Sequence, residues 1–105
     1  MEPLQQLARD KLQAATSMLH GVEPRSMFGA NGFCKDSKAF CMVTKHSQIV
    51  FKVNDEVAFL TYIEMGGIRW SPNGKPFGKW LELPPEQCQD PQIMQQWAQQ
   101  AYQLI

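Results

Sequence analysis

Hydrophobic residues recur at helical spacing near both ends of this chain. Between Leu4 and Leu19 they return every three or four positions, which predicts an amphipathic helix over residues 2–20 that ends at Gly21. A closing helix is predicted over residues 91–105, because Asp90 is a favourable N-cap and Pro91 suits the first helical position. One side of this helix is apolar, and glutamines fill the other side without any charged residue.

The middle of the chain has the pattern of extended segments, rich in Phe, Val, Ile and Cys. Strands are predicted over residues 26–35, 39–44 and 48–53, and the short loops between them require antiparallel neighbours. Asn54 predicts the N-cap of a short helix that ends at the glycine pair 66–67. Two more strands are predicted over residues 68–71 and 79–83. We therefore expect an α+β fold with helices flanking a five-stranded antiparallel sheet.

The hairpin around residues 36–37 is predicted to be apolar on both faces. Pairing across a two-residue turn places Phe33 opposite Phe40, so one face holds Phe33, Phe40 and Met42, and the other holds Cys34, Cys41 and Val43. A helix can cover each face, or a partner can cover one of them. Gly29 and Gly32 fall inside the preceding strand, where glycine is typical of a bulge or a close backbone approach.

Length and composition set the class of protein. The 105 residues fit one domain, and 44% hydrophobic residues with zero net charge are ordinary for a globular chain. The N-terminus begins with an acid, Glu2, and no long apolar run follows, so we expect a cytoplasmic protein without membrane contact. The spacing of Cys34, Cys41 and Cys88 matches neither metal ligands nor a disulfide framework, which predicts reduced thiols and no cofactor.

The charges are segregated along the chain although they sum to zero. Residues 25–52 hold five basic residues and one acid, and residues 69–79 hold three basic residues and no acid. The remaining segments hold nine acids and two basic residues. Base therefore gathers on the predicted strands and acid on the predicted helices.

Several motifs together carry a resemblance to a known family. They are the run Met27-Phe28-Gly29-Ala30-Asn31-Gly32-Phe33, the segments 39–43 and 50–55, and Leu83-Pro84-Pro85-Glu86 followed by Asp90-Pro91 and Trp97-Ala98. Over about residues 22–104, this set resembles the N-terminal domain of the TfoX/Sxy competence regulators. The resemblance implies a five-stranded antiparallel sheet with flanking helices, similar to type III secretion chaperones, and a regulatory role. The matching positions are Arg25, Met27, Phe28, Gly29, Gly32, Phe40, Lys52 and Trp97.

Recognisable catalytic sets do not appear in the sequence. His20 and His46 are predicted surface residues without a neighbouring carboxylate or thiol, so we expect no enzyme. The preferred hypothesis is a protein-interaction module that self-associates and docks through its sheet or its glutamine-lined helix. The alternative is binding of nucleic acid or another polyanion along the strand surface. Its candidate residues are Lys35, Lys38, Lys45, Lys52, Arg69, Lys75 and Lys79.

Overall fold

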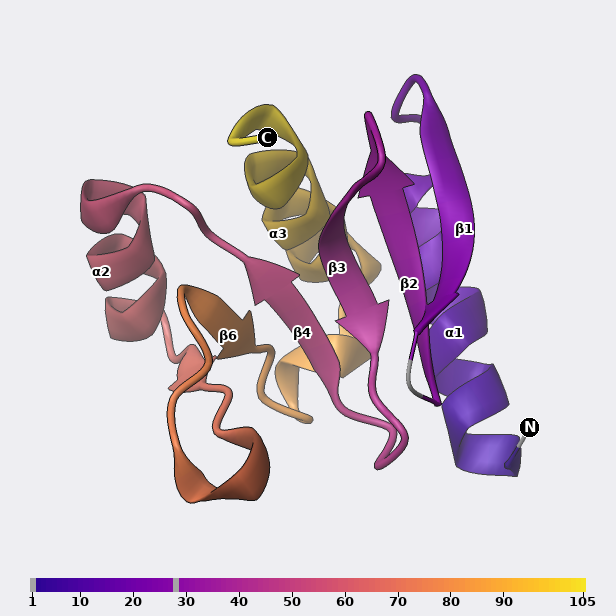
Figure 1. The fold of residues 1–105 in the computed structure, drawn as a ribbon, viewed down its shortest axis with the longest axis horizontal. Helices are drawn as coiled ribbons and strands as arrows, with labels where there is room; N and C mark the ends of the chain where they lie inside the picture. Colours follow the sequence, from indigo (N-terminus) through magenta and orange to yellow (C-terminus); the bar gives the residue numbers. More distant parts are fainter. Residues whose placement is uncertain (1, 28) are drawn as a thin grey trace.

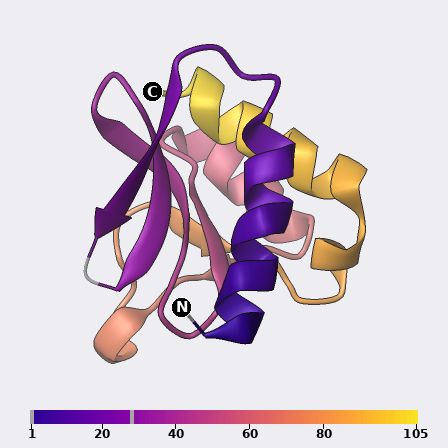
Figure 2. The ribbon, with the colours of Figure 1, turned by 90° about the vertical axis from the view of Figure 1, so that its right-hand side faces the viewer.

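The computed structural model describes residues 2–27 and 29–105 as an antiparallel sheet with three helices on one of its faces (Figures 1 and 2). The helices are α1 Pro3–Thr16, α2 Glu56–Glu64 and α3 Pro91–Gln103, with short 3-10 turns η1 Pro72–Gly74 and η2 Gln87–Gln89. The strands are β1 Val22–Met27, β2 Ala30–Lys35, β3 Lys38–Val43, β4 Ile49–Lys52, β5 Ile68–Arg69 and β6 Trp80–Glu82. They pair in the order β1-β2-β3-β4-β6-β5. The predicted α+β class and antiparallel sheet are confirmed, although the sheet has six strands instead of five.

The sixth strand arises because the segment predicted as one strand over residues 26–35 is divided between β1 and β2. Gly29, with φ of +80°, lies in the tight connection between them, a conformation that glycine adopts without strain. Pro24 lies inside β1. Because β1 is the edge strand, a proline without an N–H group is tolerated there.

Helix α1 ends at Thr16, although the apolar spacing continues to Leu19. The hydroxyl of Thr16 donates back to the carbonyl oxygens of the preceding turn, and the hydroxyl of Ser17 donates to Ala14 O at 2.8 Å. Such side-chain bonds compete with further helical ones and favour termination. Gly21, with φ of +75°, turns the chain into β1 instead of capping the helix.

A β-bulge interrupts the pairing of β2 with β3. Cys34 pairs with Ala39 and Phe33 pairs with Cys41, so Phe40 has no partner residue across the strand. The predicted pairing of Phe33 with Phe40 is therefore wrong. Phe40 and Cys41 both join the helix-side core, and the Phe40 ring meets the Tyr102 ring of α3 edge-on at 5.7 Å.

The main core lies between the sheet and the helices, with Trp97 of α3 at its centre. The Trp97 ring lies 4.8 Å from that of Tyr62 on α2 and 5.8 Å from that of Phe51 on β4. Trp97 is fully buried, so one side chain connects two helices to the sheet. The glutamines of α3 face outward as predicted, and Asp90 caps this helix by accepting from Gln92 N.

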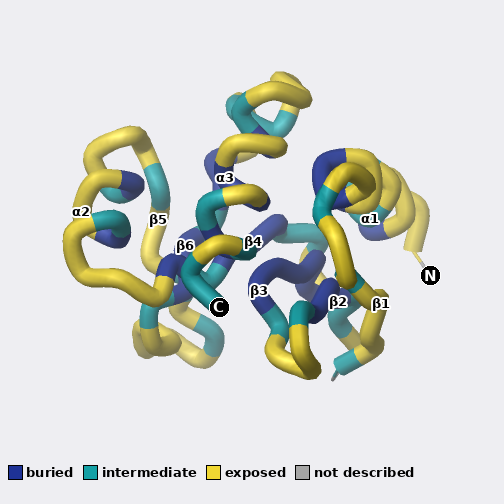
Figure 3. Tube along the Cα trace, turned by 90° about the horizontal axis from the view of Figure 1, so that it is seen from above, coloured by how far each residue is buried: buried dark blue, intermediate teal, exposed yellow. Residues whose placement is uncertain are grey.

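Helix α2 lies at one margin of the molecule, where much of its surface is exposed (Figure 3). Its N-cap is Asp55, whose carboxylate accepts from Ala58 N at 3.0 Å, and not the predicted Asn54. The chain then forms β5, folds through residues 70–79 and returns in β6. This second antiparallel pair is confirmed, but each strand is shorter than predicted.

Candidate functional site

The sheet face opposite the helices, here called the open face, carries a second apolar cluster. Buried Met42, Val50 and Trp80 form its centre, with Met27, Ala30, Ala39 and Trp70 packed around them. These residues come from β1, β2, β3, β4 and β6, and residues 70–79 fold over one side of them. The hairpin is therefore apolar on both faces, as predicted, and the three helices lie together on one face. The predicted grouping of residues is wrong, because Met42 lies on the open face, whereas Phe33, Phe40, Cys41 and Val43 all join the helix-side core.

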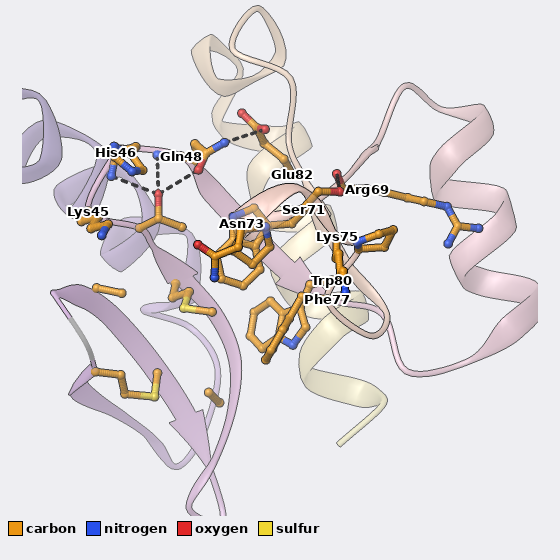
Figure 4. A pocket seen from close by; sticks show the side chains of 18 residues that line it. Lys45, His46, Gln48, Arg69, Ser71, Asn73, Lys75, Phe77, Trp80 and Glu82 are labelled. Carbon is orange, nitrogen blue, oxygen red and sulfur yellow. Dashed lines mark hydrogen bonds between the residues drawn. The ribbon is translucent and has the colours of Figure 1, made fainter.

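A groove of about 1100 Å³ follows this cluster (Figure 4). We call it the open-face groove. Its apolar lining consists of Met27, Ala30, Ala39, Met42, Trp70, Pro72, Pro76, Phe77 and Trp80. Its polar lining consists of Thr44, Lys45, His46, Gln48, Arg69, Ser71, Asn73, Lys75 and Glu82.

Three aromatic side chains build one wall of the groove. The ring of Trp70 meets the rings of Phe77 and Trp80 edge-on, at 5.4 Å and 6.2 Å between centroids. Backbone hydrogen bonds fix this loop, since Phe77 N donates to Trp70 O at 2.9 Å and Trp70 N donates to Trp80 O at 3.1 Å. Phe77 remains 53% exposed, so the wall presents an aromatic edge to solvent.

A polar network closes the opposite end of the groove, in the β3–β4 loop. The hydroxyl of Thr44 accepts from His46 N and Gln48 N, and Gln48 Nε2 donates to Glu82 Oε1 at 3.1 Å. Burial raises the pKa of Glu82, and the hydrogen bond from Gln48 opposes part of that rise. The Glu82 carboxylate in the groove lining is thus partly desolvated and accepts a hydrogen bond from the side-chain amide of Gln48.

The predicted anion-binding residues are divided between the two faces. Lys35 lies 4.1 Å from the centre of the Tyr102 ring, and Arg69 and Lys79 lie 5.0 Å and 5.3 Å from that of Phe59. All three therefore point toward the helices, and Figure 4 shows the Arg69 guanidinium turned away from the groove. These cations interact with aromatic rings of the main core.

The remaining candidates lie elsewhere. Lys45 and Lys75 line the groove from two different loops. Lys52 follows Phe51 in β4, and Phe51 points into the main core. Lys52 therefore points to the open face, where its cross-strand partner is Trp80. Lys38 is exposed beside the 36–37 turn, at the start of β3. The structure thus brings Lys45, Lys52 and Lys75 to one face and does not join all seven into one surface.

Comparison with models of protein families identifies the family of this chain. The model of the TfoX N-terminal domain matches residues 14–105, nearly the whole chain. The chain belongs to the TfoX N-terminal domain family. No curated protein and no solved structure matches this chain. The resemblance predicted from the motifs is confirmed, and the matched region reaches back into α1, further than the motifs did.

The predicted TfoX-family motif positions serve several parts of the fold. Phe40 and Trp97 are core residues, and exposed Arg25 donates from Nη1 to Ser37 O at 3.2 Å. Met27 lines the groove and lies over Gly32, because a Cβ atom added to Gly32 would come within 2.6 Å of Met27 Cε. Phe28 lies outside the described residues.

One residue important to this family member's architecture escaped the sequence analysis. Gln5 on α1 is 7% exposed, and its Nε2 donates to Gly29 O at 2.9 Å and Thr44 O at 3.1 Å. It ties the start of α1 to the β1–β2 connection and to the end of β3. The sequence did contain a signal for this role, because Gln5 is a polar residue on the apolar side of the predicted helix.

The thiols of this TfoX-family chain are poor candidates for chemistry. Burial, and secondarily the neighbouring Cys34, raises the pKa of Cys41 well above its ordinary value. Burial also raises the pKa of Cys88, so neither thiol readily forms the reactive thiolate. Among residues 2–27 and 29–105, no three His, Cys, Asp or Glu side chains are grouped to hold a metal ion.

No helix in the described part of the chain has the length and apolar character needed to span a bilayer.

Proposed function

We propose that this protein is a non-enzymatic, cytoplasmic protein-interaction module whose open-face groove binds an apolar, acidic segment of a protein partner. The observation that carries this proposal is the apolar cluster on the sheet face that the helices leave uncovered. Contiguous apolar surface with a polar rim is typical of interaction sites. Family membership supports a regulatory setting for the interaction.

The groove offers both affinity and selectivity to such a segment. Covering the exposed part of Phe77 contributes about 1 kcal/mol, half the value for a fully buried large side chain. The ammonium groups of Lys45 and Lys75, together with Lys52 on the same face, favour carboxylates on the incoming chain. Glu82 also lines the groove, and its carboxylate accepts a hydrogen bond from Gln48 Nε2.

The placement of the aromatic rings favours a protein over a nucleic acid. Sequence-tolerant binding of single strands uses open ring faces on which bases stack. Here Trp70 packs edge-on against both Phe77 and Trp80, and Trp80 is buried. Three of the seven candidate cations also point toward the helices. Polyanion binding at Lys45, Lys52 and Lys75 stays the second candidate.

The cysteines support the two other parts of the proposal, the cytoplasmic location and the absence of enzymatic activity. Cys34, Cys41 and Cys88 are free thiols, which suits a reducing compartment. The raised pKa values of Cys41 and Cys88 weigh against a thiolate nucleophile.

Site-specific photo-cross-linking in cells tests the groove as the binding surface. A cross-linking amino acid replaces half-exposed Phe77 in one variant and exposed Gln99, on the outer side of α3, in a control variant. We expect a discrete adduct with one polypeptide from position 77 and none from position 99. The same adduct from both positions, or none from position 77, would refute the groove assignment.

The cross-linked polypeptide is then purified and its binding measured directly by calorimetry. Phe77→Asp and Lys75→Glu should each weaken binding about tenfold or more, which corresponds to ~1.4 kcal/mol, and Gln99→Glu should leave it unchanged. Unlabelled oligo-dT and oligo-U at low and high salt form a parallel arm. Tight, salt-sensitive binding of these oligonucleotides with no effect of Phe77→Asp would favour the polyanion alternative.

A further inference from the structure

Helix α2 is apolar on its outer side as well as on its inner side. Phe59 and Tyr62 point into the core, whereas Val57 and Leu60 are 75% and 52% exposed. Burying such a side chain fully is worth roughly 1.5–3 kcal/mol, so their exposure leaves a substantial gain unrealised. Helices that are apolar all round are typically covered on both sides.

The outer side of α2 is also acidic. Glu64 follows Leu60 by four positions and therefore lies on the same side of the helix, next to Val57 and Leu60. Glu56 is exposed in the first turn, and residues 55–64 contain no basic side chain. Glu64 lies eight positions after Glu56, a rise of about 12 Å, so carboxylates flank the exposed apolar pair along the helix axis.

The open-face groove has the complementary character. Its floor is apolar, and Lys45 and Lys75 reach its rim from separate loops. The two surfaces differ in the charges beside their exposed apolar side chains, because Glu56 and Glu64 flank the outer side of α2 and Lys45 and Lys75 lie at the groove. Arg69 and Lys79 lie against Phe59 on the inner side of α2, and Glu82 lies in the groove lining. Complementary surfaces of this kind attract each other and set the register of association.

The two surfaces of one chain cannot meet each other. Phe59 packs α2 into the main core on the helix side of the sheet, while the groove opens on the opposite face. Figure 1 shows α2 at one side of the molecule, past β4 and β6 and away from β1 and β2. The helix that enters a given groove must come from another molecule.

We propose that the open-face groove binds helix α2 of a second copy of this chain, with Val57 and Leu60 on its apolar floor and Glu64 beside Lys75. This inference rests on the proposed function, because it names the partner of the same groove. Each copy carries both surfaces, so two copies can exchange helices reciprocally or several can join head to tail.

Charge reversal with cross-complementation tests the contact. Sedimentation velocity of the purified chain over a range of concentrations should give species heavier than the 12.0 kDa monomer. Lys75→Glu and Glu64→Lys should each reduce the association constant about tenfold or more, because each variant alone brings like charges together. An equimolar mixture of the two variants should recover association, since opposite charges then meet in both kinds of contact.

Control measurements distinguish a loss of association from a loss of folding and from a failure of the groove assignment. Lys75 and Glu64 are exposed, so circular dichroism should show both variants folded, and Lys38→Glu, at the far turn, should associate like the parent chain. A monomer at every concentration, or a mixture that associates no better than the single variants, would overturn the inference. A foreign protein cross-linked at position 77 under those conditions would overturn self-recognition while leaving the proposed function standing.

Discussion

Gln5 offers a sharp test of how the β1–β2 connection is held. Its side-chain amide is the donor to two main-chain carbonyl oxygens, those of Gly29 and Thr44, which are 24 and 39 residues away in sequence. Gln5→Ala removes both bonds and leaves the Thr44 oxygen in a buried site without this donor. Thr44 also supports the polar end of the groove, so the perturbation acts on the fold and beside the site.

The magnitude follows from the two bonds. A net hydrogen bond contributes about 0.5–1.5 kcal/mol, and the Thr44 oxygen keeps its bond from Ser47 N after the substitution. We expect the loss of both bonds in Gln5→Ala to lower the free energy of unfolding by about 1–3 kcal/mol. The melting temperature should fall by roughly 5–20 °C for a domain of this size. Gln5→Glu should cost more at neutral pH, because a carboxylate would face the same two oxygens.

Urea unfolding followed by circular dichroism provides the measurement, and the adjacent residue provides the control. Gln6 is exposed and donates to Asp10 within the helix, so Gln6→Ala has the same change in helix propensity but loses about 0.2–0.5 kcal/mol from its side-chain pair. Equal unfolding free energies for the Gln5→Ala and Gln6→Ala variants would refute the reasoning. The m-value should stay constant if the loss is local.

Two further substitutions test the core and the groove. Gly67→Ala should lower the free energy of unfolding, measured by urea titration, by about 1–3 kcal/mol. The new Cβ would lie 2.8 Å from Trp97 Cη2 and 2.8 Å from a main-chain oxygen. An unchanged urea midpoint would contradict this close packing. For Glu82, burial raises the pKa above its ordinary 4.5, so its favourable contribution is complete below that pH and is lost as pH rises through the folded value. Glu82→Gln should therefore gain stability relative to the parent chain as the pH rises above 4.5, and a pH-independent difference would argue against a raised pKa.

Local signals in the sequence identified most elements correctly. The cap at Asp90 and the proline after it set the start of α3, and apolar spacing set its buried side around Trp97. These features depend on neighbours within one or two helical turns, which is why a single sequence reveals them. The family resemblance came from the same kind of local motif, and the match over residues 14–105 confirms it.

The features that sequence reasoning missed depend on contacts between distant residues. Gly29 has the same apolar flanks whether it lies within a strand or in a turn, and the positive φ that separates β1 from β2 cannot be read from them. The bulge at Phe40 likewise depends on how β3 meets β2. Residues 72–78 lie between the two predicted strands 68–71 and 79–83, and the aromatic wall forms only when Trp70 and Phe77 meet in space.

The unpaired Phe40 also bears on how this hairpin tolerates changes in length. Removing that one residue would leave Ala39 and Cys41 adjacent, on opposite faces, and would restore an uninterrupted ladder without turning any neighbour around. What would be lost is a fully buried core side chain, together with its aromatic contact with Tyr102 near the end of the last helix. This one extra residue therefore links the hairpin to the C-terminal helix. Its deletion would remove that link while leaving the pairing of the strands intact.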